Sequence, residues 1–176
     1  MLDIFIKYGE EDYKIAKNIA YCIVEERKNE HIQTTRQLSE LIQKVKQKVK
    51  INRKNKRKQK THPAQKIFQA LRIHINRELE VLERMLQSSF NILSAGGKIG
   101  IISFHSLEDR IVKKFFKLYS RECLCPKEIL QCNCKEIFPK RLVIHKPFPI
   151  IPNEEEIQKN PRSRSAKLRI ATVKIL

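Results

Sequence analysis

One stretch of the sequence, residues 61–116, holds a long amphipathic helix pattern that runs directly into a short strand pattern. In its first half, apolar residues recur at steps of three or four, which keeps one face of an α-helix apolar. These positions are Ala64, Phe68, Leu71, Ile75, Leu79, Leu82, Leu86, Phe90 and Leu93. Pro63 suits the first turn of a helix, and Gly96 and Gly97 suit its end, because glycine readily adopts the left-handed conformation of a C-cap. The spacing therefore predicts one helix that ends before Gly96.

The residues after these glycines predict a buried strand and a second helix. Residues 98–104 form a short β-rich apolar run, which is typical of a buried strand. Ser106 is the expected N-cap of the next helix, where Glu108 and Asp109 lie in the first turn and counter the helix dipole. Helix, strand and helix in this order indicate an α/β unit.

The polar cluster between this strand and the second helix is the first place to look for function, because ligands of α/β folds bind at the carboxyl ends of strands. His105 and Ser106 are its candidate catalytic residues. His105 could orient a substrate or could satisfy a backbone carbonyl, and the pattern does not separate the two. A solvated loop that only caps a helix is the alternative for the whole cluster.

Three long segments closely resemble the RsmH/MraW family of methyltransferases. They are HPAQKIFQALRIHINREL from His62, LSAGGKIGIISFHSLEDRIVKKFF from Leu93 and NPRSRSAKLRIA from Asn160. A fourth segment, from Tyr8 to Arg27, is similar to that family's YGEE helix, so the resemblance covers essentially the whole chain. It implies an enzyme that transfers a methyl group from S-adenosylmethionine to N4 of a cytosine in small-subunit ribosomal RNA. Its expected partner is that RNA or the small ribosomal subunit.

The resemblance also implies a fold class: α/β, as part of a class I (Rossmann-like) methyltransferase domain with a helical domain inserted into it. Residues 1–76 would form the helical inserted domain, with a basic loop at residues 44–60. Residues 77–176 would form the C-terminal half of the methyltransferase domain.

The family's cofactor loop, a glycine-rich turn after the first strand, has no counterpart in this sequence. There are four glycines, Gly9, Gly96, Gly97 and Gly100, and no GxGxG segment. The family's acidic residue for the cofactor ribose and its Asp-Leu-Gly motif are absent too. The chain thus resembles the C-terminal part of such an enzyme, without the N-terminal cofactor-binding strands, and a separate N-terminal half is a candidate partner. We expect weak or no binding of S-adenosylmethionine by this chain alone, an unpaired strand edge and an exposed apolar face.

The resemblance suggests six substrate-facing residues: His62, Gln69, Arg72, Asn76, Arg162 and Arg164. Gln69, Arg72 and Asn76 are three and four residues apart, so they share a helix face, and their side chains can read a base edge or hold a phosphate. Arg162 and Arg164 lie in a loop with two hydroxyls that suits a phosphate or a carboxylate. An exposed polar residue without a ligand is the alternative for each. A last strand, residues 166–175, is expected to pair antiparallel.

A net charge of +18, from 37 Lys and Arg against 19 Asp and Glu, indicates binding to polyanions. Residues 44–60 hold ten Lys and Arg and no acid, which predicts a mobile loop or a fraying helix end that grips phosphates without reading sequence. Biased composition is the alternative. A non-catalytic RNA-binding fragment that uses this segment is the second hypothesis for the whole chain.

The cysteines allow a third hypothesis. Cys123, Cys125, Cys132 and Cys134 lie within twelve residues and could reach a tetrahedral zinc ion, which would make a zinc-stabilised nucleic-acid module. Their C-x-C spacing is tighter than the usual C-x2-C, so reduced thiols in a surface loop are the competing interpretation.

The N-terminal residues predict a location. Lys7, Glu10, Glu11 and Asp12 interrupt any apolar run that could act as a signal peptide, and no segment approaches the roughly 20 apolar residues of a membrane span. We therefore expect a cytoplasmic protein with no membrane partner. Thr34 or Thr35 is the expected cap of a helix that follows, and residues 153–159 are expected to form a short acidic helix.

Overall fold

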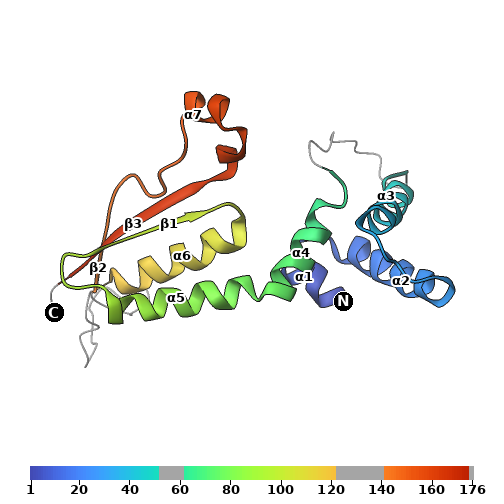
Figure 1. Cartoon of the computed structure of the whole chain (residues 1–176), viewed down its shortest axis with the longest axis horizontal. Helices are drawn as coiled ribbons and strands as arrows, with labels where there is room; N and C mark the ends of the chain where they lie inside the picture. Colours follow the sequence, from blue (N-terminus) through green and yellow to red (C-terminus); the bar gives the residue numbers. More distant parts are fainter. Residues whose placement is uncertain (52–61, 122–140, 175–176) are drawn as a thin grey trace, which may run out of the picture. The chain divides into compact units, whose positions relative to one another are not determined.

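The computed structural model describes residues 1–51, 62–121 and 141–174 (Figure 1). The chain divides into two compact units, Met1–Glu78 and Leu79–Leu176. This boundary falls two residues beyond the one expected from the sequence. That the first unit is an inserted domain stays a prediction.

The first unit is helical in its described residues. Its helices are α1 (Leu2–Lys7), α2 (Tyr13–Asn29), α3 (Thr35–Ile51) and α4 (Gln65–Asn76). Helix α2 packs against α3, and α1 packs against both α2 and α4. Four large side chains at the centre of this unit are fully buried: Phe5, Ile19, Ile42 and Ile67.

Local side-chain bonds explain where α2 and α3 begin. The carboxylate of Asp12 accepts hydrogen bonds from the first backbone N–H groups of α2. At α3, the Thr34 hydroxyl accepts from the backbone N–H of Gln37 at 3.2 Å, and the Gln37 side-chain oxygen accepts from the backbone N–H of Thr34 at 2.9 Å. This reciprocal pair is a capping box. The expected cap at this position is therefore confirmed for Thr34.

The helix expected from residue 63 to Leu93 is in fact two helices. Arg77 adopts the left-handed conformation, with φ 52° and ψ 36°, so α4 ends at Asn76 and α5 (Glu78–Ile92) starts anew. In α4 the expected apolar face is wrong for Ile75, which is 72% exposed, whereas Phe68 and Leu71 pack against the core. The pattern also left out the buried side chains of this helix: Ile67, Ala70 and Ile73. The expected apolar face is confirmed in α5, whose buried Leu86 lies among packed side chains of the same face: Leu82, Phe90 and Leu93.

The second unit combines α5 with a three-stranded antiparallel sheet. Its other elements are β1 (Lys98–Ser103), α6 (Ser106–Tyr119), β2 (Leu142–Ile144), α7 (Glu154–Lys159), the 3₁₀ helix η1 (Pro161–Ser165) and β3 (Lys167–Val173). The strand order is β1-β3-β2, and β3 pairs antiparallel with both neighbours, as predicted for the last strand. Ser103 at the end of β1 faces Lys167 at the start of β3. This mixed unit is consistent with part of a methyltransferase domain, whereas the Rossmann-like class stays a prediction.

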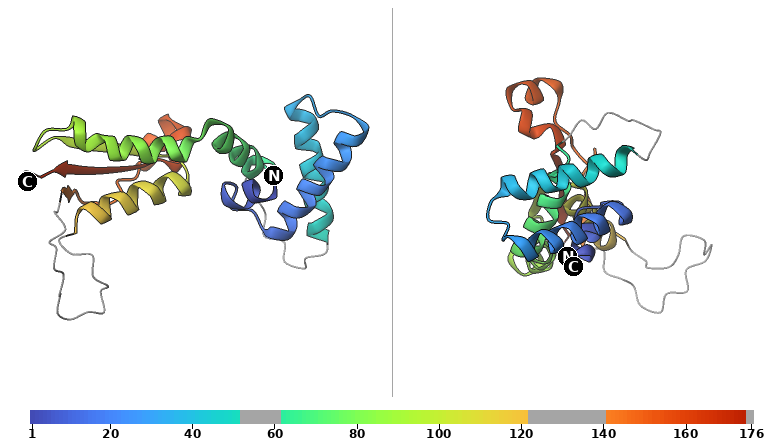
Figure 2. Two further views of the ribbon diagram at one scale, coloured as in Figure 1. Left: turned by 90° about the horizontal axis from the view of Figure 1, so that it is seen from below. Right: turned by 90° about the vertical axis from the view of Figure 1, so that its right-hand side faces the viewer.

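Helices α5 and α6 lie along one face of the sheet and form its core (Figures 1 and 2). Ile99, Val112 and Phe116 are buried there, and Phe90 packs edge-on against Tyr119 with ring centroids 4.8 Å apart. The opposite face is open, with Ile102 58% exposed, so the prediction of a buried strand is wrong for one side of β1. Within the described residues β1 pairs on one edge only.

Short capping bonds also shape the C-terminal part of this unit. The predicted acidic helix is α7, and the Asn153 side-chain oxygen accepts from the backbone N–H of Glu156 at 2.8 Å. The segment with the two expected substrate-facing arginines is η1 rather than an irregular loop. Among the helices that the structure describes, none has both the length and the apolar character needed to cross a membrane.

Candidate functional site

The polar cluster after β1 is built around a capping box at the start of α6. His105, in extended conformation with φ −135° and ψ 164°, is the N-cap, and its Nδ1 accepts from the backbone N–H of Glu108 at 3.4 Å. The Glu108 carboxylate in turn accepts from the backbone N–H groups of Phe104, at 2.9 Å, and His105, at 3.3 Å. The expectation that Ser106 caps this helix is therefore wrong: Ser106 is its first residue and is exposed.

The second nitrogen of the His105 ring also lies near Glu108. Nε2 lies 3.3 Å from Oε1 of Glu108, close to the carboxylate but without hydrogen-bond geometry. Because Nδ1 accepts a hydrogen bond, the neutral ring carries its hydrogen on Nε2, which faces this carboxylate. Burial acts to raise the pKa of Glu108, but contact with the His105 ring and the Phe104 N–H outweighs it and lowers that pKa. The ring is thus fixed in one orientation.

A buried ion pair lies next to the capping box. The Arg169 guanidinium donates from Nε to Oδ1 of Asp109 at 2.7 Å and from Nη2 to Oδ2 at 3.1 Å. Lys167 Nζ approaches Oδ2 at 3.4 Å, and the Ser103 hydroxyl approaches Oδ1 at 3.5 Å. The Arg169 hydrogen bonds hold the pKa of Asp109 below its ordinary value, although burial opposes them. The pair ties the first turn of α6 to the ends of β1 and β3.

Arg169 was not predicted from the sequence to belong to this site. Its side chain is 4% exposed, and its guanidinium carbon lies 4.2 Å from the centre of the Phe148 ring, in a cation–π contact. One signal was available: Arg169 alternates with Ala171 on the strand face that contacts the core. An arginine at such a position needs a buried acidic partner. Asp109, which the sequence explained by the helix dipole alone, is that partner.

A cleft of about 370 Å³ opens beside the capping box, and we call it the α6–η1 cleft. One wall comes from the turn between β1 and α6, with Phe104, His105 and Ser106. The facing wall comes from η1 and the start of β3, with Arg164 and Lys167. The register of the sheet explains this meeting, because the end of β1 lies opposite the start of β3.

The α6–η1 cleft brings together three residues singled out from the sequence, His105, Ser106 and Arg164. Arg162 belongs to the same turn of η1 but does not line the cleft. The sequence missed Phe104 and Lys167. Phe104 had been counted as part of the apolar strand, yet it follows β1 and is 54% exposed.

The four substrate-facing residues predicted in the first unit do not gather at one point. Arg72 donates two hydrogen bonds to the Glu78 carboxylate, at 2.8 and 3.1 Å, and Asn76 donates to the same carboxylate at 3.3 Å. These contacts lie around Arg77, the C-cap residue at which α4 has ended. His62 precedes the start of α4, and its Nε2 lies 2.8 Å from Nε2 of Gln43. Gln69, between them on α4, is half-buried.

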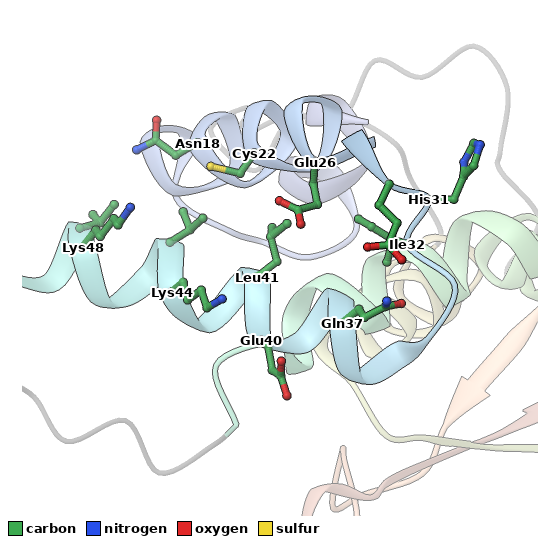
Figure 3. Close-up of a pocket in the computed structure, with 13 residues that line it drawn as sticks. Asn18, Cys22, Glu26, His31, Ile32, Gln37, Glu40, Leu41, Lys44 and Lys48 are labelled. Atoms are coloured by element: carbon green, nitrogen blue, oxygen red, sulfur yellow. The ribbon is translucent and has the colours of Figure 1, made fainter. Parts of the chain in front are cut away.

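A second hollow, of about 410 Å³, lies between α2 and α3 of the first unit. Figure 3 shows Cys22 and Leu41 facing one another across it, with Lys48 near one end and Gln37 near the other. Its walls carry acidic, basic and apolar side chains, and none of the residues expected to face the substrate lines it. Its larger volume therefore does not make this hollow a better candidate for the functional site than the α6–η1 cleft.

The basic segment is helical where the structure describes it. Residues 44–51 are the last turns of α3, so the expected loop is wrong for this part and the alternative of a helix end agrees with it. Residues 52–61 lie outside the described residues. Lys46 cannot grip a phosphate, since it is 3% exposed and paired with the Glu11 carboxylate. The expected zinc ligands Cys123, Cys125, Cys132 and Cys134 also lie outside the described residues.

Comparison with known proteins places this chain among relatives that are named as methyltransferases. A relative from Caldicellulosiruptor bescii named "Ribosomal RNA small subunit methyltransferase H" is 48% identical over 168 residues, which is 96% of this chain and 51% of that protein. Relatives with the same name from Clostridioides difficile and Desulforapulum autotrophicum are 46% and 44% identical, over 93% and 97% of this chain. The chain spans about half the length of these relatives.

The family model for the MraW methylase family matches residues 1–174. The chain belongs to the MraW methylase family. The resemblance noted from the sequence motifs is thereby confirmed.

Proposed function

We propose that this chain forms the RNA-facing part of an enzyme that transfers a methyl group from S-adenosylmethionine to N4 of a cytosine in small-subunit ribosomal RNA. The observation that carries the proposal is the α6–η1 cleft, where a strand end, a capped helix and two cationic side chains meet. Family membership supports the reaction class, and the names of the relatives support ribosomal RNA as the substrate.

In this proposal, the residues of the chain bind and orient the RNA. Methylation of an exocyclic amine needs its nitrogen placed in line with the methyl donor and a route for its proton. Ser106 is exposed at the cleft and has a hydroxyl that can contact a base. His105 acts through orientation, because its Nδ1 accepts from the backbone N–H of Glu108 and its Nε2 lies 3.3 Å from the Glu108 carboxylate. Arg164 and Lys167 supply positive charge for the RNA backbone.

The described residues do not fit S-adenosylmethionine. A cofactor cradle needs glycines that leave room for the ligand, but a Cβ at Gly9 would meet the Phe5 carbonyl at 2.6 Å and one at Gly97 would meet the Ser94 carbonyl at 2.8 Å. Gly96 serves a turn with φ 80°. We therefore propose that a complementing polypeptide supplies the cofactor site. This polypeptide would correspond to the half of the relatives that the chain does not match.

The test is calorimetry with S-adenosylmethionine on three samples: the chain, the N-terminal half of the Clostridioides difficile relative, and their mixture. The proposal predicts binding in the mixture and weak or no binding by the chain. The mixture should also label small ribosomal subunits from a tritiated methyl donor, and nucleoside mass spectrometry should find N4-methylcytidine. A different methylated nucleoside would contradict the assignment to N4. Turnover by the chain alone would contradict the need for a complementing half.

A non-catalytic RNA-binding fragment is the second candidate, and the net charge of +18 favours it. It predicts RNA binding that weakens steeply with salt and does not change with S-adenosylmethionine. No methyl transfer by the mixture, together with such binding, would make it the better account. For either candidate we propose a cytoplasmic location and the small ribosomal subunit as partner.

A further inference from the structure

The α6–η1 cleft holds an aromatic ring that the fold itself does not use. Phe104 is 54% exposed, although the strand before it supplies Ile99 to the core. Its backbone is fixed, because its N–H donates to the Glu108 carboxylate at 2.9 Å. A ring held at its base and open to solvent gives the fold little stabilisation, so Phe104 is available for contact with a flat apolar ligand surface.

The charges opposite this ring suit a phosphate. Arg164 is exposed on the facing wall, and no acidic side chain pairs with it in the part of the chain that the structure describes. Lys167 is only partly committed: its Nζ lies 3.4 Å from Asp109, whose closer partner is Arg169, and its side chain is 43% exposed. Two cations with spare donors, placed across a cleft from an aromatic ring, match the two ends of a nucleotide.

We propose that the α6–η1 cleft binds one unstacked nucleotide of single-stranded RNA, with its base on Phe104 and its phosphate between Arg164 and Lys167. The volume of about 370 Å³ is at the small end of ligand sites, enough for one nucleotide but not for a duplex. The aliphatic side chains of Ile151 and Ile157, which also line the cleft, can cover the base from other sides. The inference rests on the proposed function in that RNA is the ligand.

The test uses the whole chain with Phe104→Trp, since the sequence contains no tryptophan and the new indole is then a single reporter. The probes are a single strand of about 12 nucleotides, the same strand in a duplex, cytidine 5′-monophosphate and inorganic phosphate. We expect quenching by the single strand, weaker quenching by the mononucleotide, and none by phosphate. The duplex should quench little, because its bases are stacked and paired. Tyr21→Trp, on α2 in the first unit and 64% exposed in the parent chain, is the matched control and should not respond to the mononucleotide.

Affinity separates stacking from general attraction. Phe104→Leu keeps an apolar side chain but removes the ring, and should weaken single-strand binding by roughly 5- to 150-fold, the range for loss of one stacked base. Phe104→Trp should retain the affinity of the parent chain. Circular dichroism of both variants checks that the fold is intact, and the tryptophan variant keeps the test valid if the leucine variant does not fold.

The outcomes distinguish a failure of the nucleotide site from a failure of the proposed function. If RNA binds, by fluorescence anisotropy of a labelled strand, without quenching at position 104, the nucleotide site is refuted and RNA binding survives. An equal response at position 21 would also refute it, because the effect would then be general. If no RNA binds even at low salt, the proposed function fails first. Quenching by the duplex as strong as by the single strand would refute stacking as the mode of contact.

Discussion

The buried pair of Asp109 and Arg169 gives the sharpest prediction for the stability of the second unit. Arg169→Met keeps an unbranched apolar chain in place of the aliphatic part of arginine, but removes the hydrogen bonds of 2.7 and 3.1 Å and the contact over Phe148. The Asp109 carboxylate is then left buried, with Lys167 at 3.4 Å as a weaker partner. Breaking a buried pair in this way costs about 3–5 kcal/mol, a large share of the about 5–15 kcal/mol that stabilises a typical domain.

The control is the same substitution at an exposed pair. Arg36 donates to Glu40 at 2.9 Å, but its side chain is 88% exposed, so Arg36→Met should change stability by less than about 1 kcal/mol. The double variant Asp109→Leu/Arg169→Met removes both charges, and should be more stable than Arg169→Met alone, since no uncompensated carboxylate remains.

Urea unfolding followed by circular dichroism measures these differences, and hydrogen exchange with mass spectrometry assigns them to a unit. We expect faster exchange in α6 and β3 for Arg169→Met and an unchanged first unit. A loss of less than about 1 kcal/mol for Arg169→Met would refute the argument that this pair holds the start of α6. A double variant that is no more stable than Arg169→Met would also refute this argument, because the loss of stability would then come from packing rather than from charge.

Three further predictions follow from the same region. The pKa of Asp109 is lower in the folded chain than in the unfolded chain. Its stabilising contribution is therefore present above the unfolded-state pKa and is lost as the pH falls through the folded-state pKa. Urea unfolding should show this contribution of Asp109 to the acid loss in the parent chain but not in Asp109→Asn. His105→Ala should cost about 1 kcal/mol in the same assay and Ser106→Ala less, since His105 is the N-cap, and equal losses would contradict that assignment. Arg164→Gln should weaken single-strand RNA binding more than Arg162→Gln, because only Arg164 lines the cleft, and equal effects would indicate a general basic surface.

Local signals in the sequence predicted much of the second unit. The apolar run after the two glycines predicted β1, the alternation of residues 166–175 predicted β3, and Asn153 before three acids predicted α7. These elements depend on neighbours along the chain, which a single sequence displays. The same reasoning placed His105 and Ser106 at a strand end, where the cleft was found.

The predictions that were wrong have physical causes that a local sequence pattern does not contain. The break at Arg77 has no glycine or proline to indicate it, and the apolar spacing continues through it, so the left-handed conformation of Arg77 could not be predicted from the pattern. The partner of Asp109 lies 60 residues away along the chain. Lys46 looked like part of a solvated basic run, because its partner Glu11 lies 35 residues earlier in the sequence, between α1 and α2.

The open side of β1 leads to a last prediction, about association. Ile102 is 58% exposed on a strand that has one hydrogen-bonded neighbour in the described chain, and exposed apolar edge strands recruit other chains. We expect the purified chain to self-associate, and Ile102→Lys to reduce this because a charge on the open face opposes burial. Light scattering at increasing concentration measures the effect, with Tyr21→Lys, an equally exposed position on α2, as control. A monomeric parent chain, or equal effects of both lysines, would refute the view that this face awaits a partner. A complementing half that suppresses the association of the parent chain would identify the face as the surface where the enzyme is completed.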